Sequence, residues 1–397
     1  MTIEIRTPTD DDWEPICRAD GLAFGMSYTA EEMAQRRALH DMSRFRIAVD
    51  NGQIVSTAGS CAFDVTLPGG ITVPMGGVTW VSTLATHRRK GLMRQVVQAV
   101  HDDIDDRGEP LASLGASEGS IYEHLDYGIA TRDRMISLDK KSASIRREYQ
   151  PNPGEVRYIE GDEVVPALSE IWARFRRCRA GEVSRSPEAD DLMFEVRGRP
   201  DGALGAAAYL CHRDGYAVYR IEQNWNNGHP AHVLHLAELA AITPQAHAAL
   251  WHTVLSVDLV GEIRSRALPD DDPLPYLLEN QRALRTNHSN DNIWVNVRDA
   301  AICFGARTYR AHDRLVIEVD GKRWAIEGGP DGATCRVVRT RADLTTSHAW
   351  FSALLYGGVL PTALVAGRRM TARNAEALRR ADLFFPTSVM PHCQTHY

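Results

Sequence analysis

A strand, a basic turn and a helix follow one another between Gly77 and Arg94, and this segment constrains the fold of the chain more than any other. Strand-forming residues around Trp80 lead into a turn that contains Gly91. Apolar residues then recur at helical spacing, at Leu92, Val96, Val100 and Ile104. The sequence therefore predicts a short strand that passes through a glycine turn into an amphipathic helix.

The start of this predicted helix is suited to an anion. The first backbone N–H groups of a helix have no intrahelical partner and carry partial positive charge. Gly91 adds no Cβ, and Arg88, Arg89 and Lys90 add positive charge, so the turn is typical of a pyrophosphate site. A solvated charge cluster is the alternative. The chain has 52 acidic against 45 basic residues, so we expect no nucleic-acid partner.

Two neighbouring segments resemble a known family. Residues 88–93 read Arg-x-x-Gly-x-Met, which resembles the Arg/Gln-x-x-Gly-x-Gly/Ala signature of the GNAT acyltransferases, although Met93 replaces the usual small residue. Residues 111–131 continue with an Ala-Ser-Glu-Gly turn, an Ile-Tyr pair and a Tyr-Gly-x-Ala-Thr exit. Together they resemble the Eis family of actinobacterial N-acetyltransferases, most strongly over residues 70–131.

The resemblance implies an α+β fold in which tandem GNAT-like domains precede a sterol-carrier-like C-terminal domain. We expect an acetyl-CoA-binding domain at 1–147, a degenerate GNAT-like domain at 148–287 and the sterol-carrier-like domain at 288–397. A chain of 397 residues exceeds the usual size of a single core. The Pro- and Gly-rich residues 150–154 look like a linker, and no second Arg-x-x-Gly turn follows them.

The resemblance also implies acetyl-CoA as co-substrate and a set of residues that hold it. The thioester is expected along a splayed strand, where a backbone amide can polarise its carbonyl. The pyrophosphate is expected at the helix start. The expected residues are Val81, Ser82, Thr83, Arg88, Arg89, Lys90, Gly91, Leu92, Met93, Arg94, Ser117 and Glu118.

Two tyrosines are the expected catalytic residues. Tyr122 matches the general acid of the family in its Ser-Glu-Gly-x-Ile-Tyr frame, and a phenol stays protonated at neutral pH. Tyr127 is a rival donor, which the frame assigns to a structural role. The resemblance implies that the terminal carboxylate of Tyr397 is the general base. Many chain ends are frayed, but this tail is not a purely polar one, which favours an ordered end.

The expected acceptor is a bulky or multi-amine compound, such as an aminoglycoside. Phe24 and Trp80 fall at aromatic positions of the acceptor pocket. Met26 and His396 stand at two further pocket positions, where an acid is expected instead. Glu118 and Asp126 remain as possible sources of negative charge.

Other functions remain open at this stage. The same core could acetylate lysines of proteins, or the apolar residues 351–367 could line the pocket of a non-enzymatic lipid carrier. The tail residues His392, Cys393 and His396 could ligate a metal, but one local cluster is weak evidence and we expect none. The family further implies a homo-oligomer, a hexamer, while the N-terminus lacks a secretion signal and favours the cytoplasm.

Several local features carry their own predictions. Thr29 and Glu32 have the spacing of a capping box, and Thr243 with Pro244 has the pattern of a helix start. Strands at 54–63 and 71–83 should form a hairpin through residues 68–70. Residues 345–367 carry no charge but are interrupted by glycines and a proline, so we expect two short buried elements and no membrane span. The seven scattered cysteines should be reduced.

Overall fold

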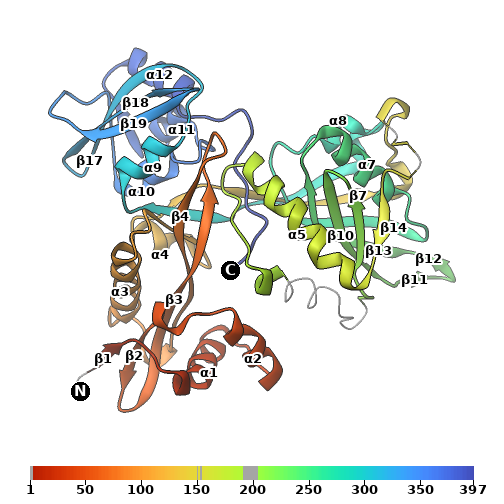
Figure 1. The fold of residues 1–397 in the computed structure, drawn as a ribbon, viewed down its shortest axis with the longest axis horizontal. Helices are drawn as coiled ribbons and strands as arrows, with labels where there is room; N and C mark the ends of the chain where they lie inside the picture. The colour runs from red at the N-terminus through yellow and green to blue at the C-terminus, as the bar shows by residue number, and fades with distance from the viewer. Residues whose placement is uncertain (1–2, 150, 153, 191–203) are drawn as a thin grey trace. The chain divides into compact units, whose positions relative to one another are not determined.

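The computed structural model describes residues 3–149, 151–152, 154–190 and 204–397 (Figure 1). The chain divides into two compact units. Unit 1 comprises Met1–Thr131, Asn292–Ser388 and Thr395–Tyr397, and unit 2 comprises Arg132–Asp291 and Val389–Gln394. The predicted limits after 147 and 287 both fall within unit 2, and they stay a prediction.

The first sheet of unit 1 has seven strands in the order β1-β2-β3-β4-β5-β16-β6. Only β4 and β5 pair in parallel, and the other neighbours are antiparallel. The strand β16 comes from a distant part of the sequence and lies between β5 and β6. The strands are β1 (Glu4–Arg6), β2 (Arg46–Asp50), β3 (Gln53–Thr66), β4 (Thr72–Thr83), β5 (Leu111–Gly115), β6 (Gly128–Ile129) and β16 (Ile293–Val297).

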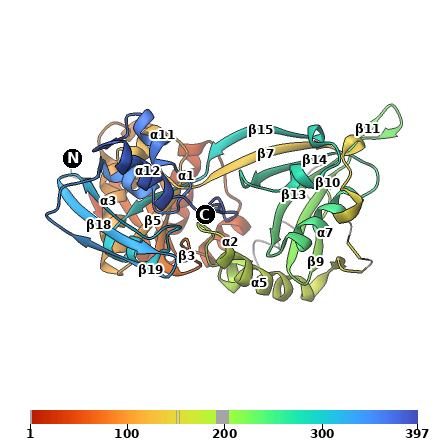
Figure 2. The same cartoon turned by 90° about the horizontal axis from the view of Figure 1, so that it is seen from above.

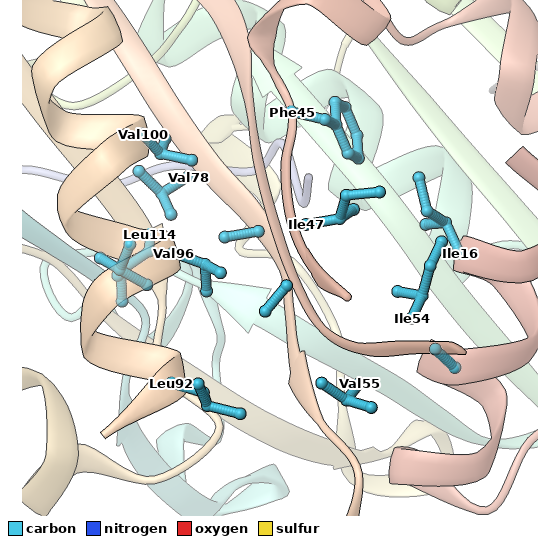
Figure 3. Packing of buried hydrophobic residues seen from close by; sticks show 14 of the residues in the cluster. Ile16, Phe45, Ile47, Ile54, Val55, Val78, Leu92, Val96, Val100 and Leu114 are labelled. Carbon is cyan, nitrogen blue, oxygen red and sulfur yellow. The ribbon is translucent and has the colours of Figure 1, made fainter. Parts of the chain in front are cut away.

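Helices cover both faces of this sheet. Figure 3 shows Val96 and Leu92 of one helix pointing into the space between that helix and the sheet, where Val78 also lies, with Ile16 and Ile47 on the opposite side. These side chains are at most 4% exposed, and burying each one contributes about 1.5–3 kcal/mol. The helices are α1 (Trp13–Phe24), α2 (Ala30–Ala38), α3 (Leu92–Asp106) and the short α4 (Gly119–Glu123).

A second sheet of unit 1 has five strands in the order β19-β18-β17-β20-β21. The fully buried guanidinium of Arg307 donates hydrogen bonds to the carbonyls of Leu354 (2.8 Å), Leu355 (2.6 Å) and Phe385 (2.7 Å), so it ties two helix ends together. The elements are β17 (Asp313–Val319), β18 (Lys322–Gly329), β19 (Gly332–Val337), β20 (Leu344–Thr346), β21 (Met370–Ala372), α9 (Ala300–Ala306), α10 (His348–Ala353), α11 (Pro361–Ala366) and α12 (Ala375–Phe384).

Unit 2 contains its own seven-stranded sheet, ordered β15-β7-β14-β13-β10-β9-β8. Figure 2 shows β7 and β15 side by side at one edge, where they pair antiparallel. The elements are β7 (Arg132–Asp139), β8 (Arg157–Ile159), β9 (Ala208–His212), β10 (Gly215–Glu222), β11 (Trp225–Asn226), β12 (His229–Pro230), β13 (His232–Ala241), β14 (Val260–Leu268), β15 (Leu284–Asp291), α5 (Val164–Phe175), α7 (Pro244–Leu255) and α8 (Leu274–Leu277).

Most of the local predictions are confirmed. Thr29 and Glu32 form the capping box of α2, and Thr243 caps α7 with Pro244 in its first turn. The predicted hairpin is the β3–β4 pair. The uncharged stretch forms two short helices as predicted, but only α10 is mostly buried, whereas α11 buries Pro361 and Leu364 alone. Within the described ranges no helix is long and apolar enough to cross a membrane. All seven cysteines are free thiols.

Candidate active site

The predicted strand, turn and helix are β4, the basic turn and α3. Gly91 is the N-cap of α3 and adopts a left-handed conformation, with φ 76°. Such a φ is strained for most residues but not for glycine, which explains why Gly91 stands here. The first backbone hydrogen bond of α3 runs from Gln95 N to Gly91 O, so the N–H groups ahead of it have no intrahelical acceptor and are suited to an anion.

Strand β4 separates from β5 beside this helix start. The parallel pairing between the two strands covers Met75 to Gly77 and ends at the pair Gly77–Ser113. On the other side of β4, the pairing with β3 shifts register between Thr57 and Gly59. Opposite this shift Trp80 has a φ of 53°. The expected splayed strand is therefore present, and its backbone beyond Gly77 borders the opening.

A cavity of about 410 Å³ lies between the splayed strand and the start of α3. Its lining includes eleven of the twelve residues expected to hold acetyl-CoA. Lys90 alone of that set lies outside the described lining. The eleven are Val81, Ser82, Thr83, Arg88, Arg89, Gly91, Leu92, Met93, Arg94, Ser117 and Glu118.

The charge of this cavity is suited to phosphate groups. Arg88, Arg89 and Arg94 are exposed at its wall. Within the described residues these three arginines form no ion pair, so their guanidinium groups are available to a ligand. Glu118 is the one acid of the lining. Three cations together with a helix start make this wall strongly attractive to a pyrophosphate.

A second cavity, of about 340 Å³, lies on the other side of Tyr122. The two cavities share Phe24, Val81, Ser117 and Tyr122, so Tyr122 lies where they meet. Of the residues expected to bind the acceptor, Phe24, Met26 and Trp80 line the second cavity, which we call the acceptor cavity after this expectation. His396 is exposed and lies outside the described lining of both cavities.

Trp80 is fixed by a neighbouring histidine. Its Nε1 donates a hydrogen bond to Nε2 of His40 over 2.8 Å. Nδ1 of the same imidazole lies 3.6 Å from Sγ of Cys61. Burial, aided by nearby arginines, lowers the pKa of His40 to about 4, so the ring is neutral and its Nε2 can accept. This contact orients the indole along the acceptor cavity.

Sequence reasoning missed three polar residues of the acceptor cavity: Asp20, Tyr28 and Arg36. The hydroxyl of Tyr28 donates to Oδ2 of Asp20 over 2.7 Å. Burial raises the pKa of Asp20, although Tyr28 and Arg36 act in the opposite direction. The guanidinium carbon of Arg36 lies 5.2 Å from the ring centroid of Tyr28. No local motif marks these residues, because they lie in and around two helices that only the fold brings to the cavity.

Tyr122 has the environment of a proton donor. It lies in α4 and is 6% exposed. Burial raises the pKa of its phenol above the ordinary value, and a hydrogen bond with Ser117 opposes this only in part. Tyr127, the rival donor, is fully buried, and its hydroxyl forms a 2.7 Å hydrogen bond with His101. Tyr127 is outside the described lining of both cavities, in agreement with a structural role.

The last residue of the chain is ordered in unit 1. Tyr397 lines the acceptor cavity together with Tyr122. Its hydroxyl lies 2.6 Å from Oγ of Ser113, and its ring packs on Phe63 with 4.8 Å between the centroids. The terminus of this chain is therefore held by specific contacts.

The upstream tail residues have a different environment. His392 is buried in unit 2, where its Nε2 lies 2.9 Å from Oδ1 of Asp133 and its Nδ1 lies 3.5 Å from Oε1 of Glu182. Burial alone would lower the pKa of this imidazole, but the two carboxylates outweigh it and raise the pKa to about 9. His392 is therefore a cation paired with acids at neutral pH. In the described residues, no group of three potential ligands is arranged to hold a metal ion.

This buried ion pair makes stability depend on pH. The pKa of His392 is about 9 in the folded chain and about 6.5 when unfolded. Its contribution to the free energy of unfolding is therefore complete below pH 6.5 and is lost as pH rises through 9. We expect the difference in unfolding free energy between the unchanged protein and His392→Gln to fall by on the order of 3 kcal/mol from pH 6 to 10. Urea unfolding across this range measures it. A difference that does not change with pH would contradict the assignment.

Comparison with known proteins agrees with the geometry of the site. Models of the acetyltransferase (GNAT) domain match residues 4–130 and 181–298, and a sterol carrier protein domain model matches residues 301–394. The N-acetyltransferase Eis of Mycobacterium tuberculosis is 30% identical, and the match covers 98% of both chains. This chain belongs to the Eis family of GNAT N-acetyltransferases. The predicted order of domains is thereby confirmed.

Other relatives of this Eis-family chain are similar over their full length. An uncharacterized N-acetyltransferase of Streptomyces avermitilis is 32% identical over 98% of both chains. The crystal structure of Eis1 from Mycobacterium abscessus superposes with a TM-score of 0.88, at 27% identity, over 99% of this chain and 100% of that one. The Eis-family chain is accordingly an N-acetyltransferase, and GNAT acetyltransferases use acetyl-CoA as acetyl donor.

Proposed function

We propose that this enzyme transfers the acetyl group of acetyl-CoA to an amine of a bulky or multi-amine acceptor, such as an aminoglycoside. One observation carries the proposal. A cavity with a basic helix start and a cavity with aromatic walls meet at Tyr122, and Tyr397 lines the second of them. A phosphate-bearing donor suits the first cavity, and an organic amine suits the second.

The splayed strand supports a position for the thioester. In this proposal the acetyl group lies along Val81, Ser82 and Thr83, where the backbone beyond the last β4–β5 pair is free to donate to the carbonyl oxygen. Preorganised N–H donors stabilise the oxyanion that develops when the amine attacks, and this effect is commonly the largest in acyl transfer. The arginines of the turn hold the pyrophosphate and so fix the register of the donor.

Proton transfer completes the reaction. The carboxylate of Tyr397 removes a proton from the acceptor ammonium, directly or through water, so that the nitrogen lone pair can attack the acetyl carbon. The C–N bond forms, the C–S bond breaks, and the departing thiolate takes the proton of the Tyr122 phenol. The attacking nitrogen then loses its second proton, which returns directly or through water to the Tyr122 phenolate, so the product is the neutral amide. A phenol is protonated at neutral pH, and burial raises the pKa of Tyr122 further, so the proton is present when the thiolate forms.

The direct test is the release of free thiol from acetyl-CoA by the full chain with an untagged C-terminus. Aminoglycosides, polyamines and lysine peptides serve as acceptors, and the acetylated product is identified by mass. We expect release that depends on a small-molecule amine. Faster turnover of lysine peptides would favour the protein acetyltransferase. No release with any amine, together with a copurifying lipid, would favour the carrier. Phe351 in the proposed lipid segment is already stacked on Phe304 in the core, 4.4 Å between centroids.

Arg36 should weaken the binding of polycationic acceptors. It lines the acceptor cavity, and within the described residues it has no ion-pair partner. We expect Arg36→Glu to lower the KM for polyamines roughly tenfold, since a change of two charges within about 6 Å is worth 1–2 kcal/mol in a solvated site. Arg18→Glu gives the same net charge on an exposed part of α1 outside the acceptor cavity. An equal effect of the two variants would show that net charge alone acts.

The assembly and location are the remaining parts of the proposal. The family resemblance supports a homo-oligomer, a hexamer, in the cytoplasm. Light scattering of the purified chain measures the number of subunits. A monomer with full activity would remove the oligomer from the proposal without affecting the chemistry.

A further inference from the structure

The side chain of the last residue occupies a site formed by three adjacent strands of unit 1. Phe63 lies on β3, Gly77 on β4 and Ser113 on β5, and we call these three residues the tyrosine socket. We infer that the tyrosine socket binds the Tyr397 phenol and thereby positions the terminal carboxylate beside the acceptor. This inference rests on the proposed function, in which that carboxylate is the base. Ser113 and Gly77 are positioning residues in this scheme and do not touch the reacting atoms.

The polar end of the tyrosine socket is Ser113. This serine is fully buried, and its Oγ lies 2.6 Å from Oη of Tyr397. Because a buried hydroxyl that loses its partner costs about 1–3 kcal/mol, the buried Ser113 hydroxyl favours the docked position of the Tyr397 phenol. A terminal phenylalanine would leave Ser113 without this partner. The contact therefore selects tyrosine among the aromatic residues.

The apolar walls leave room for a ring and for little else. The ring of Tyr397 packs on Phe63 at an interplanar angle of 47°. A Cβ added to Gly77 would lie 2.6 Å from Cε2 of Phe63 and 2.8 Å from Cε2 of Tyr397. Such distances are far below van der Waals contact, so any side chain at position 77 would displace one of the two rings. Glycine is required here by the ring that docks against it.

The position of the tyrosine socket explains its use. Gly77 and Ser113 form the last residue pair before β4 and β5 separate. The docked ring thus lies at the root of the opening whose outer part is lined by Trp80, Val81 and Tyr122. A chain end is ordinarily mobile, whereas a catalytic group must be held within about 0.5 Å of its working position. Docking the ring leaves the carboxylate few rotations about its own bonds.

The first test measures docking without any reaction. Carboxypeptidase A removes Tyr397 only while the end of the chain is undocked, so the release rate follows the undocked population. Rates are divided by those of free peptides with the same last six residues. We expect Ser113→Ala and Tyr397→Phe each to speed release about tenfold, because each removes the hydrogen bond between the two hydroxyls. Gly77→Ala should speed it at least as much. Ser265→Ala, a buried serine of unit 2, is the matched control and should have no effect.

A double-mutant cycle identifies the contact itself. Combining Ser113→Ala with Tyr397→Phe removes both hydroxyls at once, so we expect release to return toward the rate of the unchanged protein. The kcat for acetyl transfer should be lower in the two single variants and should partly recover in the double variant. The KM for acetyl-CoA should stay constant in all three. Release at the unchanged rate in Ser113→Ala, or single effects that simply add, would overturn the inference. Tyr397→Phe alters only the chain end, so a folding defect in the serine variant cannot obscure the result.

A one-residue extension separates this inference from the proposed function. A glycine added after Tyr397 keeps the phenol and moves the carboxylate. If this chain keeps its kcat, the terminal carboxylate is not the base and that part of the proposed function fails. The release assay on the chain that ends at Tyr397 still tests whether the tyrosine socket binds the Tyr397 phenol. Loss of kcat in the extended chain, with slow release in the unchanged protein, supports both.

Discussion

Tyr122→Phe should lower kcat by roughly a hundredfold to ten-thousandfold, the usual contribution of a positioned acid. The ring occupies the same volume, so both cavities keep their shape. The substitution removes the proton for the departing thiolate, together with the hydrogen bond between the phenol and Ser117. Binding of acetyl-CoA, measured by calorimetry, should change less than about twofold, because the proposed phosphate site is at the start of α3 and not at Tyr122.

Tyr127→Phe is the matched control for this substitution. Tyr127 lies five residues further along and outside the described lining of both cavities. Its loss leaves His101 without a partner in the core, at a cost of about 1–3 kcal/mol of stability, while kcat should stay unchanged. If kcat falls by the same factor in both variants, or if Tyr122→Phe abolishes acetyl-CoA binding, Tyr122 is not the general acid.

Deletion of Tyr397 should have an effect of similar size. The new terminal carboxylate would be on His396, about 3.5 Å short of its former place along an extended chain. We expect kcat to fall about a hundredfold or more, as for the loss of a general base, with acetyl-CoA binding retained. The measurement is single-turnover acetyl transfer at saturating acetyl-CoA, which separates chemistry from product release.

Chemical rescue provides the control for this deletion. Acetate or formate added to the shortened chain can occupy the space left by the carboxylate, and we expect either to restore part of the lost turnover. Neutral acetamide should not. A shortened chain that turns over at the original rate would show that another group, or solvent, removes the amine proton.

Much of the cavity proposed for acetyl-CoA could be predicted from the sequence. The turn at Gly91 and the helix after it are local, because a left-handed glycine and helical spacing of apolar residues act within a few positions. Eleven of twelve expected residues consequently line one cavity. Lys90 is exposed and lies outside the described lining of this cavity, so its part in holding the donor stays a prediction.

The acceptor half was harder to predict, because its members meet only through the fold. Asp20 and Arg36 come from two helices, and their shared cavity depends on how those helices pack on β4. The residues near the C-terminus were hard to predict for the same reason. His392 is part of a short cluster that suggests a metal ligand, yet its partners Asp133 and Glu182 are far away in the sequence. Local patterns reveal the type of side chain but not its distant partners.

The place of β16 in the first sheet has a consequence for how the chain is made. Residues 293–297 pair with β5 and β6, and Trp294 is 5% exposed in the same core as α1 and α3. A ribosome that has reached residue 131 has delivered the whole acetyl-CoA turn but not the strand that covers β5. At about 5–20 residues per second, β16 follows on the order of ten seconds later. Until then β5 presents an open apolar edge, so the first sheet of unit 1 is complete only after the long first segment of unit 2, Arg132–Asp291, has been synthesised.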